Sequence, residues 1–179
     1  MRARQLPLIL VIGVLLLAGC VPQPAEDPVE PAPSSAPVFA SEEEALAAAV
    51  AAYEEYLKVS DAIAADGGAN PERLKDLVTE EWYEVEVEGF ASISEAGISQ
   101  VGMTHSRNAV LQTYTNESPG EVRINVCADT SETTFRDATG VDVTSQSRKT
   151  LVTVEATFSL QAAGLLLDGN EPWAEDSLC

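Results

Sequence analysis

An apolar stripe at helical spacing between residues 41 and 65 is the feature that most constrains the fold of this 179-residue chain. The stripe is formed by Leu46, Val50, Tyr53, Leu57 and Ala64. Ser41 followed by Glu44 forms a capping box before it, and Gly67-Gly68 follows it as a helix-ending pair. The pattern predicts one long amphipathic helix that packs on a broad partner.

After Gly97 the pattern changes to the alternation that is typical of half-buried strands. Three sets of residues each share one parity: Val101, Met103, His105, Ala109 and Leu111; Val122, Ile124 and Val126; Val152, Val154, Ala156, Phe158 and Leu160. A short fourth strand is expected at residues 165–167, before the turn-forming sequence Asp168-Gly169-Asn170. These strands follow one another along the chain, which favours an antiparallel sheet.

The region between the long helix and the sheet is expected to hold two short helices. Asn70-Pro71 places a capping residue before a proline at the first helical position. Residues 79–90 are ambiguous, because Thr79 with Glu80-Glu81 is typical of a helix start while residues 84–88 alternate like a strand; we favour a helix. The expected fold class is therefore α+β: one long and two short helices packed on a curved antiparallel sheet of about four strands, in a single domain over residues 41–179.

Residues 1–19 have the organisation of a signal peptide. A positive segment, Met1 to Arg4, precedes an apolar run from Leu6 to Leu17. This run is shorter than the roughly 20 apolar residues that a membrane-spanning helix needs, so we expect it to be cleaved. Leu17-Ala18-Gly19-Cys20 resembles the lipobox of bacterial lipoproteins, in which the cysteine takes diacylglycerol. The alternative is an ordinary secretory peptide with a chance cysteine at its end.

Residues 20–40 are predicted to form a lipidated tether. A diacylglycerol group and a palmitate chain on Cys20 would anchor the protein to the extracytoplasmic face of the cell membrane. Prolines recur through residues 21–40 and favour an extended, solvated spacer. A proline-rich ligand for a partner protein is the alternative, and nothing in the sequence favours it.

The charge of the chain excludes one class of partner. The sequence has 29 acidic and 10 basic residues, a net charge of −19, and loss of Arg2 and Arg4 with the leader would lower it by two further charges. Such a surface repels phosphates, so we expect no nucleic-acid partner. The acidic residues are spread along the chain, which is typical of a solubilising surface.

The order of one long helix, two short ones and a curved meander resembles the nuclear transport factor 2-like (SnoaL-like) cone fold. More narrowly, residues 41–179 resemble acidic lipoproteins of high-GC Gram-positive bacteria that carry this fold. The ending Glu171-Pro172-Trp173 and the terminal Cys179 add to the resemblance. It implies that the helices close a cone whose mouth could take a small apolar ligand.

The two cysteines that remain after Cys20 are expected to form a disulfide. Cys127 and Cys179 are an even pair in an exported, oxidising setting. Such a bond would tie the C-terminal tail to the second strand. The alternatives are two free thiols or a metal site, but the sequence lacks the four ligands of a structural zinc site, and we expect no metal.

Four residues are candidates for lining a pocket: Trp82, Tyr83, His105 and Trp173. His105 is the single histidine, and its shared parity with Val101 and Met103 predicts that it points toward the helix-covered side of the sheet. It would serve as a general base only if a carboxylate faced it, with Glu95, Glu155 and Asp129 as the candidates. A histidine satisfied by its surroundings, and aromatic rings that fill the core, are the alternatives.

These features favour a non-enzymatic binding or accessory module of the bacterial cell envelope. The sequence contains no nucleophile elbow, phosphate-binding glycine loop, zinc-helix motif or dinucleotide fingerprint, and no cofactor is expected. The expected partners are the membrane, through the lipid anchor, and a small apolar ligand or an envelope protein. The alternative is a cone-pocket enzyme of the isomerase or cyclase type that uses His105 as its base.

Overall fold

The computed structural model describes residues 38–174 and 178–179, and the predicted signal peptide, Cys20 and the tether up to residue 37 lie outside this part. Its elements, in chain order, are α1 (Glu42–Ala65), η1 (Pro71–Leu74), α2 (Glu80–Ala96), β1 (Ile98–Val101), β2 (His105–Tyr114), β3 (Gly120–Asp129), β4 (Thr134–Asp137), β5 (Leu151–Gln161) and β6 (Gly164–Pro172). Helices come first and strands follow, which confirms the α+β class.

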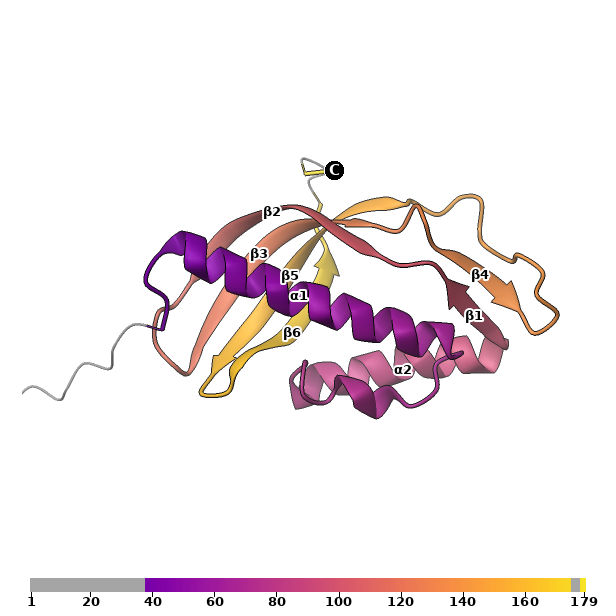
Figure 1. The fold of residues 1–179 in the computed structure, drawn as a ribbon, viewed down its shortest axis with the longest axis horizontal. Helices are drawn as coiled ribbons and strands as arrows, with labels where there is room; N and C mark the ends of the chain where they lie inside the picture. Colours follow the sequence, from indigo (N-terminus) through magenta and orange to yellow (C-terminus); the bar gives the residue numbers. More distant parts are fainter. Residues whose placement is uncertain (1–37, 175–177) are drawn as a thin grey trace, which may run out of the picture. The chain divides into compact units, whose positions relative to one another are not determined.

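The strands form two antiparallel sheets. The larger sheet has the order β2-β3-β5-β6, and the smaller one pairs β1 with β4. Figure 1 shows α1 lying across the larger sheet, with α2 beside the C-terminal half of α1. Between α1 and the larger sheet lies the core, whose largest fully buried side chains include Tyr53, Ile63, Ile124, Phe158 and Leu167.

The long first helix is confirmed, together with the residues that begin it. The Ser41 hydroxyl accepts a hydrogen bond from the Glu44 backbone N–H at 3.3 Å. The Glu44 carboxylate reaches back to the N–H of Ala40, at 2.7 Å, one residue before the position that a capping box uses. The Ser41 hydroxyl therefore satisfies one otherwise unpaired donor of the first turn, and the Glu44 carboxylate satisfies the N–H of the residue before the cap.

The prediction of two short helices after the long one is wrong in number and in length, because the described part of the chain has only one further α-helix and the other segment is a single 3-10 turn. The first is a single turn of 3-10 helix. Asn70 precedes it in the left-handed conformation (φ 56°), and the Asn70 side chain makes no capping hydrogen bond. The second, α2, has 17 residues; Thr79 caps it by accepting from Trp82 N, and Gly97 ends it in the left-handed conformation. The choice of helix over strand for residues 79–90 is confirmed, and the alternating glutamates and valines there are part of α2.

The single strand predicted through residues 101–111 is wrong, because the structure divides it. Val101 ends β1 in the smaller sheet, and His105 begins β2 in the larger one. Gly102 lies between them with φ 93°, and its Cα lies so close to the chain at Glu132 that a Cβ would come within 2.0 Å of the Glu132 carbonyl oxygen. The turn at this position requires glycine.

A β-bulge then reverses the expected alternation within β2. The register shifts between Arg107 and Val110, where Asn108 adopts φ 51°. The extra residue places Ala109 and Leu111 against the core, while His105 has the parity of Arg107. The prediction that His105 shares a face with Ala109 and Leu111 is therefore wrong.

The prediction from the sequence is more accurate for the other strands of the larger sheet. Val122, Ile124 and Val126 of β3 are fully buried, and Ala156, Phe158 and Leu160 of β5 alternate with partly exposed residues. The predicted short fourth strand is longer than expected, because β6 continues through Asp168-Gly169-Asn170 to Pro172. The strand β4 was not predicted; it has only four residues and pairs with β1, more than 30 residues earlier.

The folded part begins before residue 41. Phe39 is only 6% exposed and packs edge-on against Tyr114, with ring centroids 6.3 Å apart. The Asn116 side chain accepts from Phe39 N at 2.6 Å and donates to Phe39 O at 2.7 Å. The residues that precede α1 are thus clamped to the turn between β2 and β3.

Cys127 of β3 and Cys179 are joined by a disulfide, with Cα atoms 5.3 Å apart. This is the pairing expected from the sequence. Near it, the Asn108 side chain donates to the Leu178 carbonyl at 2.9 Å, and Trp173 N donates to Thr153 O at 2.8 Å. The described residues at the end of the chain are thereby held against β2, β3 and β5.

Candidate functional site

A pocket of about 550 Å³ lies between the start of α2 and the β5–β6 hairpin. It is lined by Lys75, Val78, Thr79, Glu80, Tyr83, Glu84, Gln161 and Leu166. Val78 is buried, Tyr83 and Leu166 are half-buried, and Lys75, Glu80, Glu84 and Gln161 are exposed. The pocket therefore combines apolar walls with a charged rim, and its volume is in the range of small-molecule sites.

The wall formed by Leu77 to Thr79 is fixed by pairing with β6. Val78 forms a parallel bridge with Leu167; Thr79 N donates to Leu167 O at 2.9 Å, and Leu167 N donates to Leu77 O at 2.9 Å. The Thr79 hydroxyl also donates to the Asp168 carboxylate at 2.6 Å. These bonds connect the start of α2 to the sheet edge, so the two walls of the pocket are held together in the folded state.

The rim of the pocket carries both positive and negative side chains: Lys75, Glu80 and Glu84. The Lys75 ammonium lies over the Tyr83 ring, 5.2 Å from its centroid, in cation–π geometry. Glu80 and Glu84 are one helical turn apart and line the same pocket. Neither carboxylate has a hydrogen bond or ion pair among the described residues.

Two hydrogen-bonded pairs of polar side chains lie in the adjoining interior, between α1, α2 and β6. The Tyr56 hydroxyl donates to the Glu86 carboxylate at 2.7 Å, and the Tyr53 hydroxyl donates to the Asn170 side chain at 3.1 Å. Burial raises the pKa of Glu86 above its ordinary value, although the hydrogen bond from the Tyr56 hydroxyl opposes the rise. Burial likewise raises the pKa of both tyrosines, so they stay protonated donors.

His105 lies elsewhere, at a smaller pocket of about 240 Å³ that Met103, Thr104 and Glu54 also line. Its side chain is 45% exposed, and its Nε2 lies 3.4 Å from a carboxylate oxygen of Glu132, which is 69% exposed. Neither Glu95 nor Glu155 forms a bond with it. Asp129 lies opposite His105 in the pairing of β2 with β3, and its carboxylate forms an ion pair with the Arg107 guanidinium at 2.7 Å. The expectation that His105 points to the helix-covered side is wrong, because of the bulge that follows it.

The structure does not bring the four predicted pocket residues together. Tyr83 lines the larger pocket and His105 the smaller one. Trp82 packs against the core, where its buried indole nitrogen has no partner with hydrogen-bond geometry among the described residues. Trp173 follows β6 and is 38% exposed. Sequence reasoning missed Lys75, Gln161 and Leu166, which reach the pocket only through the pairing of distant segments.

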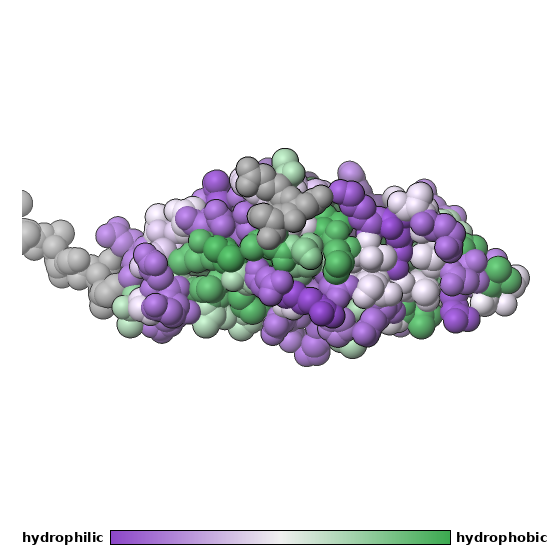
Figure 2. All heavy atoms as spheres, turned by 90° about the horizontal axis from the view of Figure 1, so that it is seen from above, coloured by the Kyte–Doolittle hydropathy of each residue, from purple (hydrophilic) through white to green (hydrophobic). Residues whose placement is uncertain are grey.

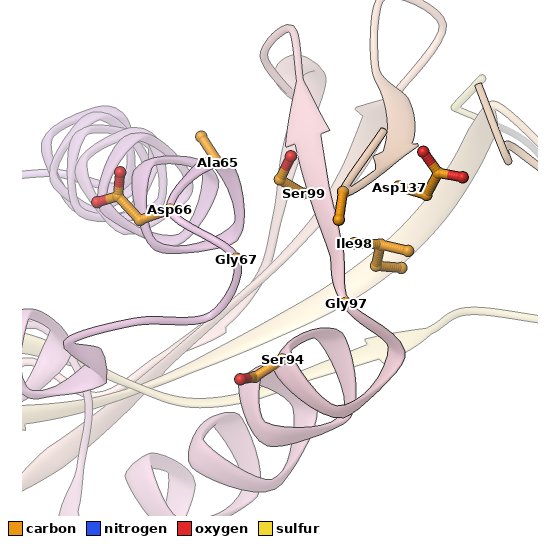
Figure 3. Close-up of a pocket in the computed structure, with 9 residues that line it drawn as sticks. Ala65, Asp66, Gly67, Ser94, Gly97, Ile98, Ser99 and Asp137 are labelled. Atoms are coloured by element: carbon orange, nitrogen blue, oxygen red, sulfur yellow. The ribbon is translucent and has the colours of Figure 1, made fainter. Parts of the chain in front are cut away.

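Another pocket, of about 400 Å³, is lined by the ends of both helices and by the small sheet. Figure 3 shows Ala65, Asp66 and Gly67 of the α1 end facing Ser94 and Gly97 of α2. Asp66 is already paired with Arg73 at 2.9 Å, and Asp137 accepts hydrogen bonds from Thr139 and Val141. Its lining holds few apolar side chains, which makes it a poorer site for an apolar ligand than the pocket beside α2.

A further pocket, of about 360 Å³, lies at the β5–β6 hairpin, where Phe39, Ala52 and Leu165 are among the lining residues. Large exposed apolar residues are scattered over several elements, such as Val85, Val101, Val110 and Leu151. On the face seen in Figure 2, hydrophobic groups gather left of the centre, and hydrophilic groups surround them. Among residues 38–174 and 178–179, no cluster of three or more His, Cys, Asp or Glu side chains is placed to hold a metal ion. No helix in this part of the chain is long and apolar enough to cross a membrane.

Comparison with known proteins supports the fold alone. No family model matches the sequence, and no curated protein matches it. The structure is similar to that of the intermembrane space region of chloroplast protein ARC6, with a TM-score of 0.53 and 10% identity over 73% of this chain and 97% of that one. At this identity the likeness concerns the arrangement of helices and strands only. The resemblance to the nuclear transport factor 2-like family stays a prediction.

Proposed function

We propose that this protein is a membrane-tethered, non-enzymatic binding module of the bacterial cell envelope, and that its ligand site is the pocket beside α2. The observation that carries the proposal is the combination of a volume of about 550 Å³ with the apolar side chains of Val78, Tyr83 and Leu166. Apolar walls with a few polar groups at the rim are the usual composition of small-molecule sites. The expected ligand is small and mainly apolar.

The fixed walls of the pocket favour binding. Because Thr79 and Leu167 hold the two sides together through backbone hydrogen bonds, a ligand would not have to order them. A preformed site avoids the conformational cost that otherwise reduces affinity. Catalysis is not needed to explain any of the lining residues, and His105 lies at a different pocket.

Retention at the membrane is proposed to depend on the lipid on Cys20. Two or more acyl chains anchor a protein stably, whereas one chain gives only marginal binding. Replacing Cys20 by alanine should move the protein from the membrane fraction to the soluble fraction, and the intact mass should lose the acyl groups. Equal membrane retention of Cys20→Ala would contradict the anchor.

The ligand site is tested by extracting the full-length protein in mild detergent and identifying copurifying small molecules by mass spectrometry. Leu166→Trp should fill the pocket and abolish copurification. The matched control is Leu151→Trp, because Leu151 lies on β5, is 43% exposed and does not line this pocket. The proposal would be refuted if no small molecule copurified, or if both variants retained it equally.

A further inference from the structure

We infer that the ligand of this pocket is a cationic amphiphile, with an ammonium group at the rim and an apolar body against Val78 and Leu166. This inference rests on the proposed function, because it names the chemical class of the ligand for the same pocket. It is carried by three observations: the unpaired glutamates of the rim, the cation already seated on Tyr83, and the balance of charge around the opening.

The two glutamates of the rim lack a cation. Glu80 and Glu84 line the pocket at an i,i+4 spacing and have no partner among the described residues. Two like charges at this spacing destabilise a helix by about 0.2–0.5 kcal/mol. An ammonium group between them would offset this repulsion and gain two charge-assisted contacts.

The Tyr83 ring already contacts one ammonium group, that of Lys75. The Lys75 ammonium is 5.2 Å from the Tyr83 ring centroid, within the range of cation–π attraction. Lys75 is exposed and lies at the rim, so it can leave the ring without losing a buried contact. A ligand ammonium would compete with Lys75 for the ring and for the neighbouring carboxylates.

The balance of charge at the opening disfavours an anion. The N-terminus of α2 contributes about half a positive charge, and Lys75 contributes one more. Against these stand Glu80 and Glu84 in the pocket and Glu81 in the same first turn of the helix. The sum is negative, so an anionic head group would meet net repulsion, and a neutral one would leave both carboxylates unpaired.

The inference is tested with three short probes that share a chain and differ in head group: hexylammonium, hexanol and hexanoate. Each is titrated by NMR into the full-length protein in nonionic detergent. We expect hexylammonium to bind most tightly and hexanoate most weakly. Lys75→Ala should raise the affinity for hexylammonium, because it removes the competing cation, and Glu84→Gln should lower it about fivefold, close to 1 kcal/mol.

Two controls separate the pocket from the general negative field of the protein. Glu88→Gln removes a charge from the same helix outside the pocket, and Lys58→Ala removes an exposed lysine of α1. Each should change the affinity for hexylammonium less than the matching pocket variant. Thermal melting checks that all variants are folded.

The outcomes distinguish the inference from the proposed function. If hexanol or hexanoate binds more tightly than hexylammonium, or if Lys75→Ala weakens hexylammonium binding, the cationic class is wrong while the pocket stands. Equal effects of Glu84→Gln and Glu88→Gln would also overturn the inference. If none of the three probes binds and no molecule copurifies with the native protein, the proposed function fails as well.

Discussion

Replacing Asp61 should destabilise the fold more than any other single change in α1 that removes only polar contacts. Asp61 is 9% exposed and accepts three hydrogen bonds: from Gln100 Nε2 at 2.6 Å, Thr104 N at 2.7 Å and Thr104 Oγ1 at 2.9 Å. It thereby ties α1 to β1 and to the segment that leads into β2. A hydrogen bond to a charged group contributes about 1.5–3 kcal/mol, and such contributions are not additive.

From these contacts, Asp61→Ala should lower the free energy of unfolding by about 3–5 kcal/mol, because the Thr104 N–H and the Gln100 amide would lose a buried acceptor. Asp61→Asn keeps one acceptor oxygen but places an NH₂ group where Thr104 N donates, so its cost should be about 1–3 kcal/mol. For a domain of this size, the loss expected for Asp61→Ala corresponds to a melting temperature lower by roughly 10–15 °C.

The assay is urea unfolding of the full-length protein, followed by circular dichroism. Glu55→Ala is the control on the same helix: Glu55 is 48% exposed, and its one partner among the described residues is the exposed Lys58, so its loss should cost less than about 0.5 kcal/mol. If Asp61→Ala and Glu55→Ala unfolded at the same urea concentration, the reasoning about the buried carboxylate would be refuted.

Three further predictions follow from other contacts. Asn116→Ala removes both side-chain bonds to Phe39 and should cost about 1–2.5 kcal/mol, with faster hydrogen exchange at the Phe39 amide; unchanged exchange would contradict the clamp. Glu86→Gln should raise the melting temperature near neutral pH, because burial raises the Glu86 pKa and the charged carboxylate therefore costs stability in the folded state. Below about pH 4 the substitution should have little effect, because the Glu86 carboxyl is then neutral in both the folded and the unfolded state. A melting temperature lowered at neutral pH would contradict this. Cys179→Ser removes a bond across 52 residues and should cost up to about 4 kcal/mol, and a thiol reductant should lower the melting temperature of the native protein but not of this variant.

The elements that the sequence predicted well are those whose signal is local and regular. The stripe from Leu46 to Ala64, capped by Ser41, is α1, and the alternation in β3 and β5 survives because both strands are central in the sheet and buried on the helix side. The pairing of Cys127 with Cys179 followed from counting the cysteines that remain after the leader.

The errors have a different physical origin. A bulge depends on one residue, Asn108, in a left-handed conformation, and nothing in the local alternation marks it. The short β4 is stabilised by pairing with β1 and not by its own four residues. For the same reason only Tyr83 of the pocket was foreseen: Lys75 and Leu166 meet there through the bridge between Val78 and Leu167, which joins segments almost 90 residues apart.

The most direct test of the proposed binding site is a crystal structure of the protein with the molecule that copurifies from the native membrane. The proposal predicts ligand density between Val78, Tyr83 and Leu166, with the Lys75 ammonium displaced from the Tyr83 ring. Density at the pocket of His105 and Met103, with the space beside α2 empty, would contradict it.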